Sequence, residues 1–216
     1  TLASGGNDMT ARLWKPASGN LLRTLKGNAL VRSVAFDARG GTLACAGEDR
    51  VVRLWEPASG NLLRTLKGHA RRVRRVTFDP AGHTLASGGD DTTVRLWDPA
   101  SGNLLRTLEG HTDVVDWTDF SSDGRVLGSK SNDDTVRLWR ADTFESAAVI
   151  AEAKDHLNWN AGLAFHPRLP LLATVGSDPG TPEVERDRVI HILELDLAVL
   201  LDTGSAAVRS AFSAAA

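Results

Sequence analysis

Serine, histidine and aspartate, the side chains of a hydrolytic triad, recur together in this chain at fixed spacings. A histidine is followed 18 residues later by a serine and 22 residues later by an aspartate, in two sets: His69, Ser87 and Asp91, and His111, Ser129 and Asp133. In a serine hydrolase such a trio activates the serine hydroxyl as a nucleophile, with the histidine as its base. The residue types alone would therefore suit acyl-transfer chemistry.

The arrangement of these trios argues against catalysis. An enzyme needs its active site once, whereas this polar trio is repeated. Each serine is expected within a strand, not on the strained strand-to-helix turn of a nucleophile elbow. Each trio is also followed by a tryptophan, Trp97 or Trp139, whose indole N–H would occupy the serine hydroxyl. We therefore predict no catalytic residues and no enzymatic activity.

The segments that carry these residues belong to a repeat of about 42 residues. One twelve-residue string, beginning Pro-Ala-Ser-Gly, occupies residues 16–27, 57–68 and 99–110 and changes at a single position. The marker tryptophans of successive copies are 41, 42 and 42 residues apart: Trp14, Trp55, Trp97 and Trp139. A repeat of this length cannot bury its apolar face alone, so the copies must stack.

Each repeat is predicted to form one small antiparallel sheet. In residues 69–110, β-branched and aromatic residues favour strands at 73–78, 83–87, 93–97 and 103–108. Glycine, proline and aspartate mark the turns between them. Sheets of this size packed radially give a β-propeller. We therefore predict an all-β fold, a β-propeller of four-stranded antiparallel blades.

Gly68-His69, Leu85-Ala-Ser87, Asp91 and Val94-Arg-Leu-Trp97-Asp98 resemble the signature of the WD-repeat β-propeller family. The resemblance covers the whole chain, although the Trp-Asp dipeptide itself occurs only at residues 97–98. It implies a buried hydrogen-bonded chain of His, Ser, Asp and Trp within each blade. Complete sets are present twice: His69, Ser87, Asp91 and Trp97, and His111, Ser129, Asp133 and Trp139.

Two copies depart from this pattern. The second blade has Asn28 in place of histidine and Cys45 in place of serine, so its chain of hydrogen bonds should be weaker. The fifth copy is degenerate, with His156, Thr174 and Asp187 as its polar residues and Leu193 in the tryptophan position.

The chain reads as a single domain, residues 1–216, of about five blades. The predicted boundaries are a partial blade at 1–27, then blades at 28–68, 69–110, 111–155 and 156–201. Residues 207–212 resemble the first strand at 31–36, so 202–216 is a candidate first strand of the closing blade or of the next one. Two alternatives stay open: a closed five-blade ring, or an excerpt of a longer propeller, for which seven is the common number of blades in the family.

Composition restricts the function classes. A formal net charge of −2 argues against a nucleic-acid partner bound through bulk charge. The single cysteine suits a reducing compartment and hence a cytoplasmic location, and no apolar run reaches the roughly 20 residues of a membrane-spanning helix. The six histidines lack paired metal-ligand spacing, and the glycine-rich turns lack a phosphate-loop lysine. We predict no metal, no cofactor and no membrane partner.

Partner-binding residues are sought where charge gathers or where the copies disagree. The densest cluster is basic: Arg71, Arg72, Arg74 and Arg75. Either Arg74 pairs with Asp116 of the next blade and the rest is solvated, or the cluster recognises a carboxylate or phosphate on a partner. A second candidate is the acidic insertion of the fifth blade, with Glu183 and Glu185, for which a neutral insertion is the alternative.

The position after the turn aspartate differs in every copy and is predicted to be free of any scaffold role. It is occupied by Met9, Arg50, Thr92 and Asp134.

By resemblance, the predicted function is a non-catalytic protein–protein interaction scaffold that binds other proteins or peptides. The near-identical tandem copies resemble WD-repeat regions attached to signalling ATPases or kinases. The alternative is therefore a ligand-sensing or autoinhibitory propeller domain of such a protein. The sequence gives no indication of the oligomeric state.

Overall fold

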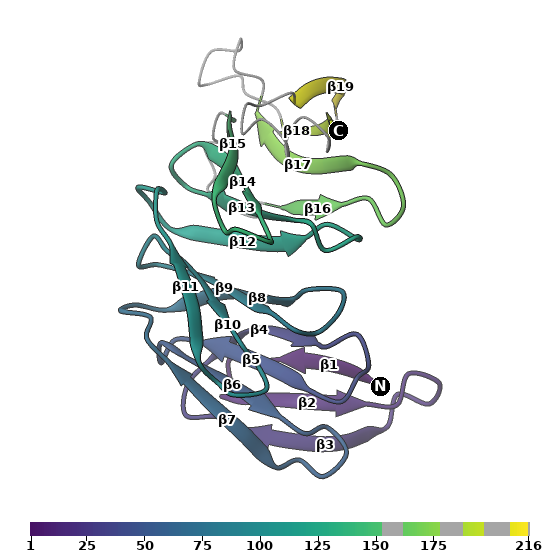
Figure 1. Ribbon diagram of the computed structural model, residues 1–216. Coiled ribbons are helices and arrows are strands. Elements are labelled where there is room, and N and C mark those ends of the chain that lie inside the picture. Colours follow the sequence, from purple (N-terminus) through teal and green to yellow (C-terminus); the bar gives the residue numbers. More distant parts are fainter. Residues whose placement is uncertain (153–161, 178–187, 197–207, 216) are drawn as a thin grey trace. The chain divides into compact units, whose positions relative to one another are not determined.

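The computed structural model describes residues 1–152, 162–177, 188–196 and 208–215, and every regular element in this part of the chain is a β-strand (Figure 1). The prediction of an all-β fold built from small antiparallel sheets is confirmed. Each sheet holds strands that are consecutive in the chain and pair as antiparallel neighbours. We number the blades by these sheets.

Three sheets lie in the first half of the chain. The first blade contains β1 (Leu2–Gly5), β2 (Thr10–Trp14) and β3 (Leu21–Lys26). The second contains β4 (Val31–Phe36), β5 (Leu43–Gly47), β6 (Val51–Trp55) and β7 (Leu62–Lys67). The third contains β8 (Val73–Phe78), β9 (Leu85–Gly89), β10 (Val94–Trp97) and β11 (Leu104–Leu108).

Two sheets lie in the second half. The fourth blade contains β12 (Val115–Phe120), β13 (Val126–Ser131), β14 (Thr135–Arg140) and β15 (Ser146–Ala151). The fifth contains β16 (Leu163–Phe165), β17 (Leu171–Ser177), β18 (Arg188–Leu195) and β19 (Val208–Ala215). The chain divides into two compact units, Thr1–Gly110 and His111–Ala216, which we describe separately.

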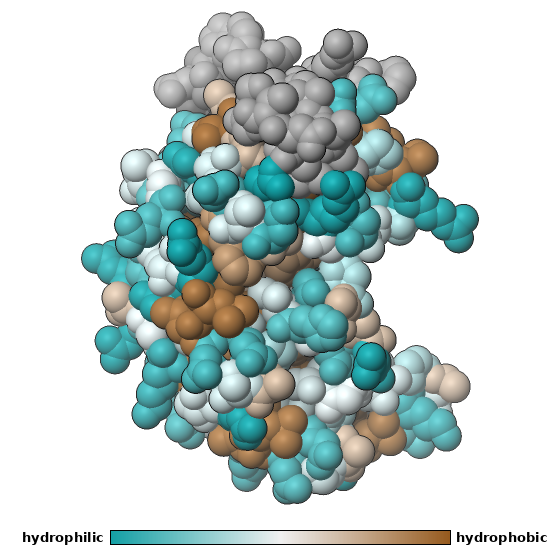
Figure 2. Space-filling view, viewed as in Figure 1, coloured by the Kyte–Doolittle hydropathy of each residue, from teal (hydrophilic) through white to brown (hydrophobic). Residues whose placement is uncertain are grey.

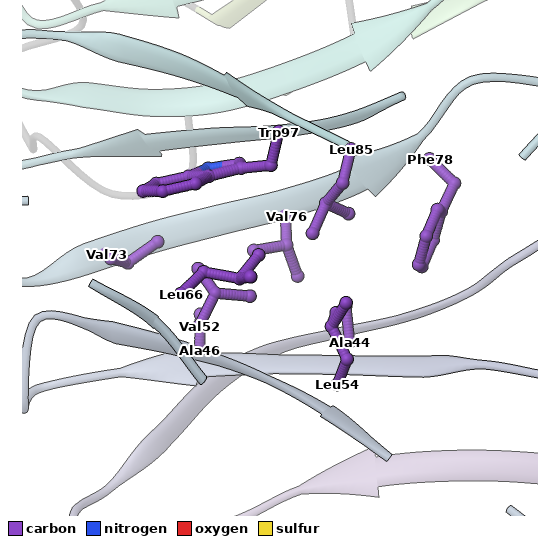
Figure 3. Close-up of a cluster of buried hydrophobic side chains, with 10 residues drawn as sticks. All are labelled: Ala44, Ala46, Val52, Leu54, Leu66, Val73, Val76, Phe78, Leu85 and Trp97. Atoms are coloured by element: carbon purple, nitrogen blue, oxygen red, sulfur yellow. The ribbon is translucent and has the colours of Figure 1, made fainter. Parts of the chain in front are cut away.

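Within each unit the hydrophobic core lies between successive sheets. In the first unit, side chains of the second and third blades form one cluster around Trp97, which is 1% exposed. Figure 3 shows these side chains meeting between the two sheets. In the second unit, Leu138 and Leu172 belong to a cluster shared by the fourth and fifth blades. Burial between sheets explains why β9 and β13 are buried along their whole length.

The last two strands of every described sheet share one irregularity. Their register shifts at the marker tryptophan, between Leu54 and Trp55 in the second blade and between Leu96 and Trp97 in the third. The same shift occurs between Ile192 and Leu193, where β18 pairs with β19. A bulge bends the strand and increases its twist. The tryptophan position is therefore marked by backbone geometry as well as by its side chain.

This bulge corrects the prediction for residues 202–216. Strand β19 is the fourth strand of the fifth blade, since it pairs antiparallel with β18 and its Ser210 lies opposite Leu193. It is neither the first strand of a further blade nor the missing strand of the first sheet, which has three strands among the described residues. Alternating β-branched, small and aromatic residues suit any strand of a pleated sheet, so the likeness of 207–212 to 31–36 could not tell a first strand from a fourth. The total number of blades stays a prediction.

The repeated Pro-Ala-Ser-Gly turn contacts the preceding blade. Arg23 of β3 donates from Nη2 to the carbonyl oxygen of Ala58 at 2.8 Å, and Arg64 of β7 makes the equivalent bond to Ala100 at 3.0 Å. The turn glycine has a positive φ of 81° at Gly60, and a Cβ built there would lie 2.6 Å from Arg23 Cδ. Glycine is thus required for the backbone and for the neighbouring arginine.

We predict that Gly60→Ala destabilises the protein more than Gly19→Ala. Both glycines have a positive φ, so each change should cost about 1 kcal/mol from left-handed strain. Gly19 has open space around it, whereas alanine at position 60 must displace Arg23, whose lost hydrogen bond adds about 1 kcal/mol. Urea unfolding of the two variants measures the difference. In an Arg23→Ala background the two costs should be equal, and a difference that persists there would contradict this explanation.

Candidate functional site

In the third blade, four side chains from four different segments form a continuous hydrogen-bonded chain. His69 Nδ1 lies 2.9 Å from Asp91 Oδ2, and His69 Nε2 lies 2.7 Å from Ser87 Oγ. Trp97 donates from Nε1 to Ser87 Oγ at 2.8 Å. The segments are the β7–β8 loop, β9, the β9–β10 loop and β10. The side chains of the expected set are thus brought together in the structure.

The fourth blade repeats this geometry. His111 Nδ1 lies 2.8 Å from Asp133 Oδ2, and its Nε2 lies 2.8 Å from Ser129 Oγ. Trp139 Nε1 donates to the same serine oxygen at 2.8 Å. Because the carboxylate can only accept, Nδ1 carries the proton and Nε2 accepts from the serine. The serine hydroxyl donates to the imidazole and accepts from the indole, so its proton and one of its two lone pairs are engaged.

Burial and hydrogen bonding set the charges in these chains. Burial by itself would raise the pKa of Asp133, but hydrogen bonds from Thr135, the Thr112 amide and His111 outweigh it and lower the pKa to about 2. The pKa of Asp91 is likewise held well below its usual range against the effect of burial. Burial lowers the pKa of His111, although Asp133 opposes the shift. The fourth blade therefore holds a neutral imidazole on an ionised carboxylate.

The second blade lacks this chain, whereas its sequence predicted only a weaker one. Asn28 is exposed, while Cys45 is buried at the serine position. The turn aspartate, Asp49, instead has Arg53 Nη1 2.7 Å from its Oδ2. The equivalent arginine of the first blade, Arg12, also pairs with its turn aspartate. Where no histidine reaches the aspartate, the third-strand arginine takes its place.

The fifth blade contains a different buried cluster that the sequence reasoning missed. Thr174, at the serine position, donates to Glu152 Oε2 at 2.7 Å, and Lys130 Nζ lies 2.5 Å from the same oxygen. His191 Nδ1 lies 3.1 Å from the other oxygen, Glu152 Oε1. Lys130 is 7% exposed and Glu152 is 6% exposed. The expected residues His156 and Asp187 lie outside the described residues.

One sequence signal could have revealed this cluster. Lys130 occupies the position of Ala46 and Gly88 in the preceding copies, which is the centre of a buried second strand. A charge in the middle of such a strand needs a charged partner. Burial lowers the pKa of Lys130, and the attraction of Glu152 acts against that shift.

The arginine cluster divides into bound and exposed members. Arg72 Nε lies 2.5 Å from Asp90 Oδ2, and Arg74 pairs with the other oxygen of Asp90. Arg72 also approaches Glu48 Oε2 at 3.5 Å. Arg71 is exposed and has no ion pair within the described part of the chain.

Arg32 joins the same network, because it also pairs with Glu48. Three arginines, Arg32, Arg72 and Arg74, thus pair with two carboxylates, Glu48 and Asp90, along this edge of the first unit. Exposed Arg71 adds a further positive charge there. Arg75 is half-buried. The pairing of Arg74 with Asp116 would join the two units and stays a prediction, and Glu183 and Glu185 lie outside the described residues.

The residue after the turn aspartate has a positive φ in each of the first four blades. The φ angles are positive, between 63° and 67°, at Met9, Arg50, Thr92 and Asp134. The prediction that these residues have no scaffold role is therefore wrong. A tight hairpin that follows the twist of its strands needs a residue with positive φ. Non-glycine residues there are strained, and two of them in the first unit, Met9 and Arg50, are exposed.

Apolar groups on the surface follow the repeat. The outer strands β3, β7 and β11 each expose a pair of leucines, at 40–52% exposure: Leu21, Leu22, Leu62, Leu63, Leu104 and Leu105. Figure 2 shows hydrophilic side chains with separate hydrophobic patches between them. Because every copy displays the same pair, these leucines do not distinguish one place on the first unit as a site.

The described part of the chain contains neither a metal site nor a membrane-spanning helix. No three histidine, cysteine, aspartate or glutamate side chains gather there in a way that would hold a metal ion. The same residues contain no helix with the length and apolar character to cross a membrane.

Comparison with known families agrees with the geometry. The family described as WD domain, G-beta repeat matches residues 19–56, 60–98 and 102–140, which together make up more than half of the chain. The chain belongs to the WD-repeat family, as predicted, and its sheets are the blades of that family's propeller fold. Proteins of this family generally act as scaffolds that bind other proteins. No curated protein matches the sequence.

We predict that acid destabilises the fourth blade in two steps. Below about pH 6.5 the unfolded chain binds a proton at His111 that the folded chain, with its lowered pKa, does not bind. Stability therefore falls as the pH drops through this value. The depressed pKa of Asp133 contributes stability above about pH 3.9 that is lost as the pH falls to about 2. Urea unfolding at about pH 7.5, 5.5, 4 and 2.5 measures both steps.

Two variants assign these steps. His111→Gln should reduce the loss of stability between pH 7.5 and 5.5, and Asp133→Asn should reduce the loss below pH 4. If both variants keep the pH dependence of the wild-type protein, the hydrogen-bonded chain of the fourth blade is not the cause of the loss of stability in acid.

We predict that Lys130→Met destabilises the second unit by about 3–5 kcal/mol, because Glu152 is left as a buried charge without its cation. The double variant Lys130→Met/Glu152→Met should lose less than the single variant, since both charges are removed together. Thermal and urea unfolding compare the three proteins. A single variant that loses under 1 kcal/mol would contradict the role assigned to this ion pair.

Proposed function

We propose that the chain is a non-catalytic scaffold that binds an acidic segment of a partner protein at the arginine-bearing edge of its first unit. The observation that carries the proposal is the excess of arginine over carboxylate at this edge, with Arg71 exposed beside the paired Arg72 and Arg74. Guanidinium groups bind carboxylates through paired, charge-assisted hydrogen bonds. An acidic peptide is therefore the partner whose chemistry suits this edge.

The loops of this edge are held together by backbone hydrogen bonds. Asp90 N donates to the carbonyl oxygen of Arg72 at 2.9 Å, and Glu48 N donates to that of Leu30 at 3.2 Å. Each bond joins the loop between the second and third strands to the loop that enters the blade. The arginines therefore project from a rigid edge, which lowers the entropy lost on binding.

Three further points belong to this proposal. The absence of catalysis is supported by the two serine hydroxyls, which are buried and bonded to both an imidazole and an indole. A cytoplasmic location is supported by Cys45, which is free and buried. The alternative, a ligand-sensing or autoinhibitory domain of a signalling ATPase or kinase, stays a prediction.

The test measures binding of a glutamate-rich peptide to the wild-type protein and to Arg71→Glu. We expect at least a tenfold loss of affinity in the variant, about 1.4 kcal/mol, together with weaker binding of the wild-type protein at high salt. Arg39→Glu is the matched control, because Arg39 is exposed in the β4–β5 loop, at the opposite end of the strands.

A glutamine-rich peptide of the same length controls for the charge of the ligand. Equal affinities of wild-type, Arg71→Glu and Arg39→Glu proteins for the acidic peptide would remove the proposed edge as the binding site.

A further inference from the structure

The fourth blade has a pocket at the end of its sheet where two of its turns meet. The β12–β13 turn contributes Gly124 and Arg125 to the lining. The end of β14 and the turn after it contribute Arg140, Ala141 and Asp142. The cavity volume is about 250 Å³, and the pocket is partly open to solvent. A water molecule takes up roughly 30 Å³ of the liquid, so this volume admits a small organic ligand.

The charge at this corner of the sheet is reversed in the fourth blade. The residue after the marker tryptophan is acidic in the second and third blades, Glu56 and Asp98, whereas Arg140 stands there in the fourth. At the start of the second strand, directly after a turn glycine with a positive φ, Arg125 takes the place of a glycine and a histidine. The same sheet forms in all three blades, so the scaffold does not require two arginines at this corner.

A hydrogen bond that the second and third blades cannot form joins the two turns. Ala141 N donates to the carbonyl oxygen of Arg125 at 2.9 Å. The other two blades have a proline at this position, Pro57 and Pro99, and proline lacks the N–H. The backbone on both sides of the pocket is therefore preorganised, which lowers the entropy lost when a ligand binds.

The side chains that line the pocket carry one net positive charge. Arg140 donates to both oxygens of Asp142, from Nε at 3.0 Å and from Nη2 at 2.8 Å. These hydrogen bonds lower the pKa of Asp142 to about 2, so its carboxylate is ionised at neutral pH. Arg125 is exposed and has no ion pair within the described part of the chain. Asp123 of the same turn does not line the pocket, and its Oδ1 accepts from the hydroxyl of Ser121 at 2.6 Å.

We propose that this pocket binds a carboxylate group, which is supplied by a small molecule or by the side chain of a peptide. Arg125 binds the carboxylate through paired N–H donors, and Arg140, held in place by Asp142, contributes a second positive charge. One net positive charge matches a carboxylate, whereas a phosphate, with a charge of about −1.5 to −2, would leave an excess of negative charge beside Asp142. This site lies in the second unit and does not depend on the arginine-bearing edge of the first.

The primary experiment titrates butyrate into the wild-type protein at pH 7 and follows the backbone amide signals by NMR. We expect saturable shifts at Gly124 and Ala141, and no comparable shift at Gly82, which lies in the equivalent turn of the third blade. Butyramide has the same shape without the charge and should give no saturable shift. A linear response to butyrate, or an equal response to butyramide, would overturn the proposal.

One variant and its matched control test the arginine. Arg125→Gln removes the positive charge and should weaken the binding of butyrate at least fivefold. Arg39→Gln is the control, because Arg39 is an exposed arginine in the β4–β5 turn, the counterpart of the β12–β13 turn, and this change should leave the affinity unaltered. Wild-type affinity in Arg125→Gln would overturn the assignment.

Ala141→Pro tests the hydrogen bond between the two turns. Phe144 N donates to the carbonyl oxygen of Arg140 at 2.9 Å and closes the β14–β15 turn, and Gly102 N closes the proline-containing turn of the third blade in the same way. The variant should therefore fold, with a cooperative thermal transition, but bind butyrate at least threefold more weakly. Wild-type affinity in the folded variant would contradict the role given to this hydrogen bond.

Further ligands identify the source of the carboxylate and the class of anion. A blocked Gly-Glu-Gly peptide that shifts the same amide signals, where Gly-Gln-Gly does not, assigns the site to glutamate side chains of a partner. A response to butyrate without a response to this peptide assigns it to small carboxylates. Methyl phosphate is the competing anion, and an affinity for it equal to or higher than that for butyrate would overturn the choice of a carboxylate.

Discussion

The serine hydroxyl at the centre of the second strand, held between an imidazole and an indole, is the interaction on which each complete blade depends. Ser87 receives the indole N–H of Trp97 and donates to His69, which in turn donates to Asp91. These four residues come from two loops and two strands, so a single chain of bonds fixes the loops of one edge to the middle of the sheet. Since Ser87 is fully buried, every unpaired group in the chain would lack water as a substitute.

The blades that lack the histidine show how this constraint is met by other means. In the second blade Arg53 forms an ion pair with Asp49. At the fifth blade Glu152 accepts a hydrogen bond from Thr174 and also contacts Lys130 and His191. In both blades a carboxylate is paired with a cation. Neither arrangement forms a continuous chain of hydrogen bonds that ends at an indole. The second blade has a small pocket lined by Trp55, whose N–H has no hydrogen-bond partner among the described residues. Beside the fifth blade the buried ion pair of Lys130 and Glu152 lies instead.

The parts of the structure that repeat could be predicted from the sequence. A spacing of residues that recurs in several copies is unlikely to arise by chance, so it indicates a structural role. The spacing of His69, Ser87, Asp91 and Trp97 recurs one copy later, and the strands between them follow from alternation and turn residues. The Lys130–Glu152 pair could not be predicted in this way, since it occurs once and joins the second strand of the fourth blade to the residue that follows its fourth strand. The positive φ at Arg50 could not be predicted from variation among the copies, because that variation concerns the side chain and not the backbone. The side chain at that position is variable, but its backbone angle is not.

The near-identity of the twelve-residue string has a physical explanation in the contact between successive blades. The first two copies supply an arginine that bonds to the turn of the following copy: Arg23 to Ala58, then Arg64 to Ala100. Because one string forms both sides of the contact, a change to either side must be matched in the neighbouring copy. The fourth blade has a different turn, with Phe144 at a positive φ and Arg140 bonded to Asp142 within the turn itself. The identity of the copies therefore ends where the shared turn ends.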